Sequence, residues 1–177
     1  EHLGKTELAI SNITRSVSAI FFVIANSFAV TTSSLVSNAI GARARNELFP
    51  ICHKVLKLGY AVGIPFVVVA LLCNRWIVSF YTDNELLIEL AFAPFVVMLL
   101  NYTFALPGYV YLNAVGGTGK TKITFLFQVT TTCVYLVYLY WLSFCIKASL
   151  SLYLTAEYLF VILLALQSII HLKSKHY

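Results

Sequence analysis

Long apolar stretches separated by short polar segments dominate this chain. The stretches cover about residues 8–40, 57–73, 86–112, 123–146 and 150–172. A bilayer core of about 30 Å is crossed by about 20 helical residues, so each stretch is long enough, or nearly long enough, to span a membrane. The pattern predicts an all-α membrane protein, a helical bundle of five transmembrane helices.

Two details of the pattern refine this prediction. The third stretch contains Pro94 and Pro107, which remove backbone donors, and we expect them to kink its helix. The fourth and fifth stretches are joined by the short segment "KASLS" and are therefore expected to be antiparallel neighbours.

Composition supports the lipid bilayer as the surrounding medium. The 177 residues are 60% hydrophobic and 11% charged, with a mean hydropathy of +0.86, whereas a soluble domain has about 25% charged residues. The net charge of +5 is scattered between the apolar runs, so we expect no nucleic-acid partner. The four cysteines form no metal-ligand or disulfide pattern, and we expect neither a metal nor a cofactor.

The basic residues predict an orientation. Eight of them fall on one side of the predicted bundle: Arg43, Arg45, Lys54, Lys57, Lys120, Lys122, Lys173 and Lys175. The other side has Lys5, Arg75 and Lys147, and Arg15 lies inside the first span. The positive-inside rule therefore predicts a cytoplasmic C-terminus.

The segment "AVGGTGKT" at residues 114–121 approaches the phosphate-loop pattern of nucleotide-binding proteins. Such a loop follows a buried strand, and its Mg²⁺ normally needs an acidic ligand from a later strand. Here the preceding residues look like a membrane helix, and the acidic residue that follows is Glu157, within the fifth span. We therefore interpret the glycines as a tight cytoplasmic turn and keep a membrane-bound P-loop ATPase as a remote alternative.

Several motifs, in order, resemble the C-terminal half of the multidrug and toxic compound extrusion (MATE) transporters. They are "LGKTELAISNI", "TTSSLVSNAIGARARNE", "YTDNELLIELA" and "LNAVGGTGKTK". The most specific is "LVSNAIGAR", which closes a long span before a basic loop. In the glycine-rich turn, Lys120 replaces the acidic residue that family members often carry.

The resemblance implies a two-lobed transporter with six helices in each lobe. Residues 1–177 would then be a partial C-terminal lobe, whose partner is the N-terminal lobe of the same transporter. The implied function is not enzymatic: it is antiport of drugs or other small amphipathic or cationic molecules, in exchange for H⁺ or Na⁺, in a bacterial inner membrane. A flippase for lipid-linked saccharides is the nearest alternative, although its diphosphate ligand favours a more cationic cavity than one intramembrane arginine provides.

Some branches of the family bind sodium through an acidic residue in the third span, but this chain has no Asp or Glu between Leu90 and Ala114. The coupling ion is therefore expected to bind mainly outside this chain.

Polar residues inside the spans are the candidates for the substrate cavity. In the first span they recur at helical spacing, interrupted by Val23, and include Asn12, Ser16, Ser27, Thr31, Ser34 and Asn38. Such a stripe is expected either to line the cavity or to pack against a neighbouring helix. Asn101, Tyr102, Tyr109 and Gln128 add amides and aromatic rings suited to flat or cationic compounds.

Arg15 and Glu157 are the two charged residues within the first and fifth spans, and each is seven residues from the outer end of its span. At about 1.5 Å per residue, both would lie about 10 Å from the outer interface. Two arrangements are open: a pair across the lobe, or two side chains that each reach water.

Overall fold

The structure is a computed structural model that describes residues 5–146 and 149–174, and in these ranges it contains helices and turns but no strand. The α-helices are α1 (Lys5–Gly41), α2 (Leu48–Leu72), α3 (Asn74–Ser79), α4 (Glu85–Leu90), α5 (Phe92–Gly117), α6 (Thr121–Trp141), α7 (Leu150–Leu154) and α8 (Ala156–Ser174). A 3-10 turn, η1 (Arg45–Glu47), precedes α2, and a π-helical turn, η2 (Leu142–Ile146), follows α6.

Within the described ranges, five helical segments are long and apolar enough to cross a membrane. They cover Leu8–Gly41, Arg45–Leu72, Glu85–Gly117, Thr121–Phe144 and Leu150–Ser174. The predicted all-α fold with five spans is therefore confirmed, and the differences concern where the spans begin and end.

The second span begins earlier than predicted, at Leu48 instead of about residue 57. In this first part of α2, Leu48, Cys52 and Val55 are buried, while His53 and Lys54 are exposed. The polar residues that interrupted the apolar pattern thus occupy the outer face of a continuous amphipathic helix.

The third span consists of two helices. Asn84 caps α4, because its side-chain oxygen accepts a hydrogen bond from the Leu86 amide at 3.0 Å. Pro94 lies in the first turn of α5, where a missing N–H leaves no helical hydrogen bond unmade. The α-helix continues through Pro107 and ends at Gly117, five residues beyond the predicted end.

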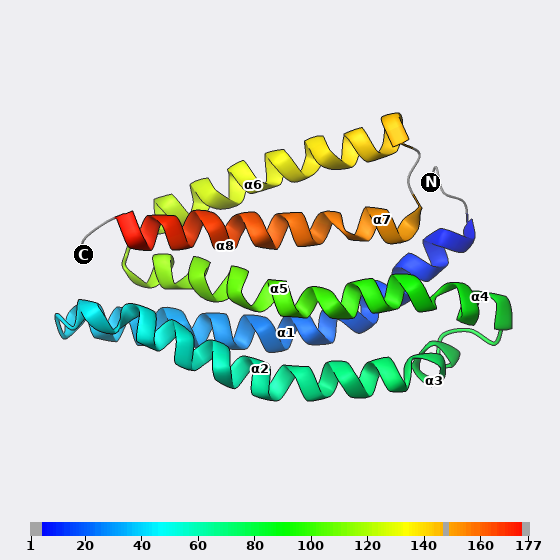
Figure 1. The fold of residues 1–177 in the computed structure, drawn as a ribbon, viewed down its shortest axis with the longest axis horizontal. Coiled ribbons are helices and arrows are strands. Elements are labelled where there is room, and N and C mark those ends of the chain that lie inside the picture. Colours follow the sequence, from blue (N-terminus) through cyan, green and yellow to red (C-terminus); the bar gives the residue numbers. More distant parts are fainter. Residues whose placement is uncertain (1–4, 147–148, 175–177) are drawn as a thin grey trace.

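Helix α5 occupies the centre of the arrangement, with α1 and α2 on one side and α8 on the other (Figure 1). Helices α6 and α8 lie side by side and run in opposite directions, as predicted. The α1–α2 and α5–α6 connections and the end of α8 share one end of the bundle. This end carries the described members of the predicted basic side. Two lysines lie outside the described residues: Lys175, predicted for the basic side, and Lys147, predicted for the opposite side.

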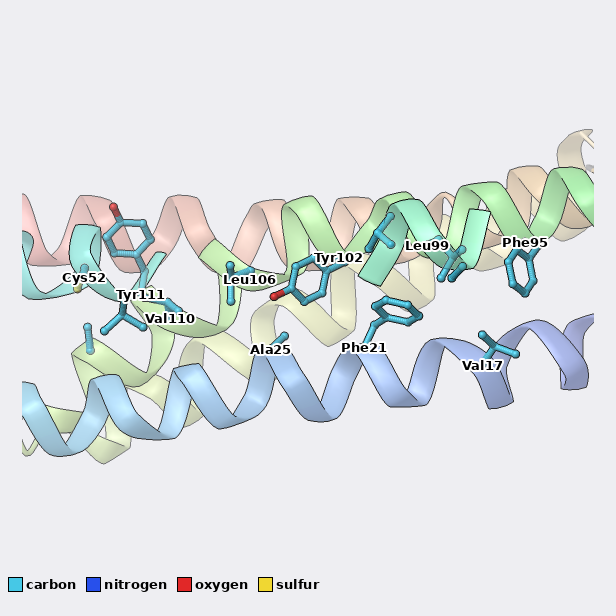
Figure 2. Close-up of a cluster of buried hydrophobic side chains, with 14 of the residues drawn as sticks. Val17, Phe21, Ala25, Cys52, Phe95, Leu99, Tyr102, Leu106, Val110 and Tyr111 are labelled. Atoms are coloured by element: carbon cyan, nitrogen blue, oxygen red, sulfur yellow. The ribbon is translucent and has the colours of Figure 1, made fainter. Parts of the chain in front are cut away.

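The apolar core lies mainly between α1, α2 and α5 (Figure 2). Val17 and Phe21 of α1 face Phe95 and Leu99 of α5, and Ala25 lies near Tyr102 and Leu106. Because protein interiors are closely packed, we expect substitutions that change side-chain volume at the contact between α1 and α5 to lower the stability of the protein.

Close backbone contacts are made possible by glycines in the second half of α5. A Cβ atom added to Gly117 would lie 2.6 Å from the Ser33 carbonyl oxygen, and one added to Gly108 would lie 2.7 Å from that of Val161. The Ser37 hydroxyl also donates a hydrogen bond to the Gly117 carbonyl oxygen at 2.9 Å. Helix α5 therefore contacts α1 and α8 at distances that a larger residue would not permit.

Two adjacent glycines provide a matched test of this packing. Gly117→Ala should destabilise the protein by about 1–3 kcal/mol, because the new methyl group meets backbone atoms of α1 that cannot move aside. The control Gly116→Ala should be neutral or slightly stabilising, since its Cβ would meet only the Thr124 methyl group, at 3.6 Å. Thermal unfolding in detergent measures both variants, and equal stabilities would contradict the close contact.

Candidate substrate cavity

A partly open cavity of about 320 Å³ lies between α1, α5, α6 and α8. Its wall is formed by Ser18, Phe21, Phe22 and Ala25 of α1, Met98, Asn101, Tyr102, Ala105 and Tyr109 of α5, Tyr135 of α6, and Glu157, Phe160 and Val161 of α8. Six of these residues are aromatic and one is a carboxylate. The volume falls within the range of about 300–1,000 Å³ that is typical of small-molecule sites.

The aromatic residues of the wall are arranged in edge-to-face pairs. Phe22 and Tyr109 have ring centroids 5.4 Å apart, and those of Tyr135 and Phe160 are 5.8 Å apart. This geometry is favourable for aromatic pairs and fixes the orientation of the rings. The cavity is thus bounded by apolar ring surface into which a few polar groups project.

Arg15 and Glu157 form an ion pair across the bundle. Arg15 Nη2 lies 3.6 Å from Glu157 Oε1, so the first of the two predicted arrangements is the one adopted. The Arg15 side chain is 57% exposed and that of Glu157 is 27% exposed. Glu157 is part of the cavity wall, whereas Arg15 is not one of the residues that form the wall.

Asn101 connects the carboxylate to the central helix. Its Nδ2 atom donates a hydrogen bond to Glu157 Oε2 at 3.4 Å. The Asn101 Oδ1 atom is buried and has no hydrogen-bond partner. Tyr135 lies within electrostatic reach of both Arg15 and Glu157. The Asn101 amide therefore links the carboxylate to α5, while its buried oxygen has no donor, which is costly.

Tyr102 closes the cavity on the side of α2. Its hydroxyl donates a hydrogen bond to the Gly59 carbonyl oxygen at 2.8 Å, and its ring packs so closely against Gly63 that no Cβ would fit there. Tyr60 makes the reciprocal hydrogen bond, from its hydroxyl to the Thr103 carbonyl oxygen at 2.7 Å. Two tyrosines thus join α2 to α5 in both directions.

The predicted site residues fall into two groups. Asn101, Tyr102, Tyr109 and Glu157 line the cavity, and Arg15 reaches it through its ion pair. The stripe residues Asn12, Ser16, Ser27, Thr31, Ser34 and Asn38 are all exposed on the surface of the bundle, and Gln128 is exposed on α6. In the described part of the chain, the stripe therefore does not pack into the bundle interior.

Hydroxyl groups of the stripe are satisfied within α1 itself. Ser16, Ser27 and Thr31 each donate to the carbonyl oxygen four residues earlier, at 2.8–2.9 Å. Their oxygen lone pairs and the Asn12 amide remain on the exposed face. Apolar side chains are exposed beside the stripe on α1, among them Ile20, Val23 and Val30, and on α6, where they include Phe125, Leu126, Val134, Leu136 and Val137; these suit contact with lipid.

Sequence reasoning missed Tyr135 and the phenylalanines of the wall. Tyr135 lies in "CVYLVYLYW", where several tyrosines follow one another, and only the packing of α6 against α8 selects the one that faces the cavity. Phe21 and Phe160 look like ordinary apolar core residues. The sequence could have predicted one of them, because Phe160 is three residues after Glu157 and therefore lies on the same face of α8.

The "AVGGTGKT" segment is the end of one helix and the beginning of the next. Residues 114–117 belong to the last turn of α5, Gly119 has a positive φ of 84°, and α6 begins at Thr121. A left-handed conformation at this turn favours glycine. The segment thus follows a helix instead of the strand that a phosphate loop requires.

The described residues contain no group of three or more His, Cys, Asp or Glu side chains placed to hold a metal ion. The groups in the cavity wall are a carboxylate, an amide, phenol groups and aromatic rings.

The structure is thus that of an all-helical membrane protein with a partly open cavity whose volume would suit a small molecule. Residues 1–141 match the MatE family. The chain therefore belongs to the MatE family of membrane transporters, in agreement with the resemblance seen in its motifs. No curated protein and no solved structure matches the chain.

The contact between Tyr102 and α2 can be tested by removing one atom. Tyr102→Phe should destabilise the protein by about 0.6–1.7 kcal/mol, because the hydrogen bond to the Gly59 carbonyl oxygen is lost inside the bundle. Tyr140→Phe is the matched control, since Tyr140 is exposed on α6. Thermal unfolding in detergent compares the two variants. A Tyr102→Phe protein as stable as the control would show that this bond does not hold α2 in place.

Proposed function

We propose that this chain is part of the C-terminal lobe of a cation-coupled secondary exporter. The exporter moves small amphipathic or cationic molecules out of the cell in exchange for H⁺ or Na⁺, and the N-terminal lobe of the same transporter completes it. Two lobes rock about a central cavity, and ion binding biases which side is open.

The observation that carries this proposal is the cavity, with Glu157 at its wall, in a chain that belongs to a transporter family. Ionisable groups within membrane spans are costly and mark pathways for substrates and ions. Aromatic rings and a carboxylate favour positively charged organic compounds over anions.

The exposed polar face of α1 supports a second lobe. Polar residues are disfavoured against lipid, and membrane helices normally direct them towards other protein or towards water-filled space. A stripe from Asn12 to Asn38 that is exposed in this lobe is therefore expected to line the path between the two lobes.

The rival functions receive less support. A lipid-linked saccharide flippase would bind a diphosphate, yet the charged residue in this cavity wall is Glu157, and Arg15 is engaged with it. A P-loop ATPase would need its glycine-rich loop after a strand, and here the loop follows α5.

We also propose the bacterial inner membrane as the location, with the basic end of the bundle and the C-terminus in the cytoplasm.

Uptake of a fluorescent cationic dye tests the proposal. Everted membrane vesicles carrying the complete transporter are given a pH gradient, an Na⁺ gradient or ATP alone. Uptake should follow one of the ion gradients and should be unchanged within about twofold in Lys120→Ala, because the glycine-rich turn does not handle nucleotide.

Vesicles without the transporter provide the baseline for leakage. Uptake that required ATP and vanished in Lys120→Ala would overturn the proposal in favour of the nucleotide loop.

A further inference from the structure

The Arg15–Glu157 pair has an unusual relation to the cavity. The carboxylate forms part of the wall, but the guanidinium that neutralises it comes from outside the wall and is 57% exposed. The two contacts made by the carboxylate are long, 3.6 Å to Arg15 and 3.4 Å to Asn101. Typical charge-assisted hydrogen bonds of this kind measure about 2.7–2.9 Å. Glu157 is therefore paired but not tightly held.

The groups around Glu157 match the chemistry of a protonated aromatic amine. The carboxylate can neutralise an ammonium group, and it lies in the cavity wall beside the Asn101 amide. The rings of Phe22, Tyr109 and Tyr135 bound the remaining space. An ammonium N–H and an aromatic ring are the two ligand features that would use these groups together.

We propose that the cavity binds a protonated aromatic amine whose ammonium group replaces Arg15 at Glu157. The inference rests on the proposed transport function, and it names the substrate class and the residue that recognises it. In the empty state Arg15 neutralises the carboxylate, and in the bound state the ligand does. The exposed Arg15 side chain can then turn towards water at the outer end of α1. Recognition is thus an exchange of one cation for another at a single carboxylate.

Equilibrium binding to the complete transporter in detergent, without any gradient, tests this exchange. The probe is 2-phenylethylammonium, and 2-phenylethanol serves as the neutral probe of matched size. Glu157→Gln should weaken binding of the ammonium probe by about tenfold or more, since a charge-assisted contact is lost. Arg15→Gln should strengthen it several-fold, because the competing cation is gone. Binding of 2-phenylethanol should change in neither variant.

A charge swap separates recognition from a purely structural role. Arg15→Glu combined with Glu157→Arg keeps the ion pair and should keep the thermal stability, but it turns the cavity wall cationic. The swapped protein should lose the ammonium probe and should bind 3-phenylpropanoate instead. The double variant Arg15→Gln with Glu157→Gln removes both charges without leaving one unpaired, and it should bind the ammonium probe as weakly as Glu157→Gln alone.

Three results would overturn the inference. They are weaker binding of the ammonium probe in Arg15→Gln, unchanged binding in the charge swap, and equal loss of both probes in Glu157→Gln. Any of these would make the pair a structural link between α1 and α8. Dye uptake driven by an ion gradient would then still stand, so failure of this inference is distinguishable from failure of the proposed function.

Discussion

The close packing of α5 against its neighbours is the interaction on which the rest of the structure depends. At Gly108 and Gly117 the backbone of α5 approaches carbonyl groups of α8 and α1 so closely that a methyl group would not fit. In a membrane, helix association is not driven by exclusion of water, so such contacts between small residues carry much of the packing energy. They hold α1 and α8 on two sides of α5, and the cavity is bounded by these three helices together with α6.

A second constraint is the free-energy cost of placing charged side chains within membrane spans, away from water. Arg15 and Glu157 come from the first and the last span, and each would be unfavourable alone. Their pairing lowers this cost, yet the pair is long and open enough for another cation to compete for the carboxylate. In the proposed exchange, the pair stabilises the bundle in the absence of substrate and gives way to a substrate cation, as reversible binding by a transporter requires.

The sequence predicted the features that belong to single helices, such as their lengths and the positions of charged residues along them. The lengths of the apolar runs predicted the spans, and the matched positions of Arg15 and Glu157 made their pairing one of two arrangements. It did not predict what depends on how the helices lie against one another. Gln128 and Tyr135 lie on the same side of α6, two turns apart, yet only the tyrosine reaches the cavity, because the cavity is level with Tyr135 and not with Gln128. The early start of α2 was missed because its exposed lysines concealed a buried face.

In the proposed exporter, the polar face of α1 borders a path that opens to alternate sides of the membrane. Labelling of single cysteines by a membrane-impermeant maleimide measures this directly, in a complete transporter whose native cysteines have been replaced. Ser27→Cys should react from either side, and the favoured side should reverse when the driving ion gradient or a transported cation is added. Leu166→Cys, exposed on an apolar part of α8, should remain unreactive throughout. A Ser27→Cys protein as unreactive as the Leu166→Cys control would place the α1 face in lipid and contradict the account.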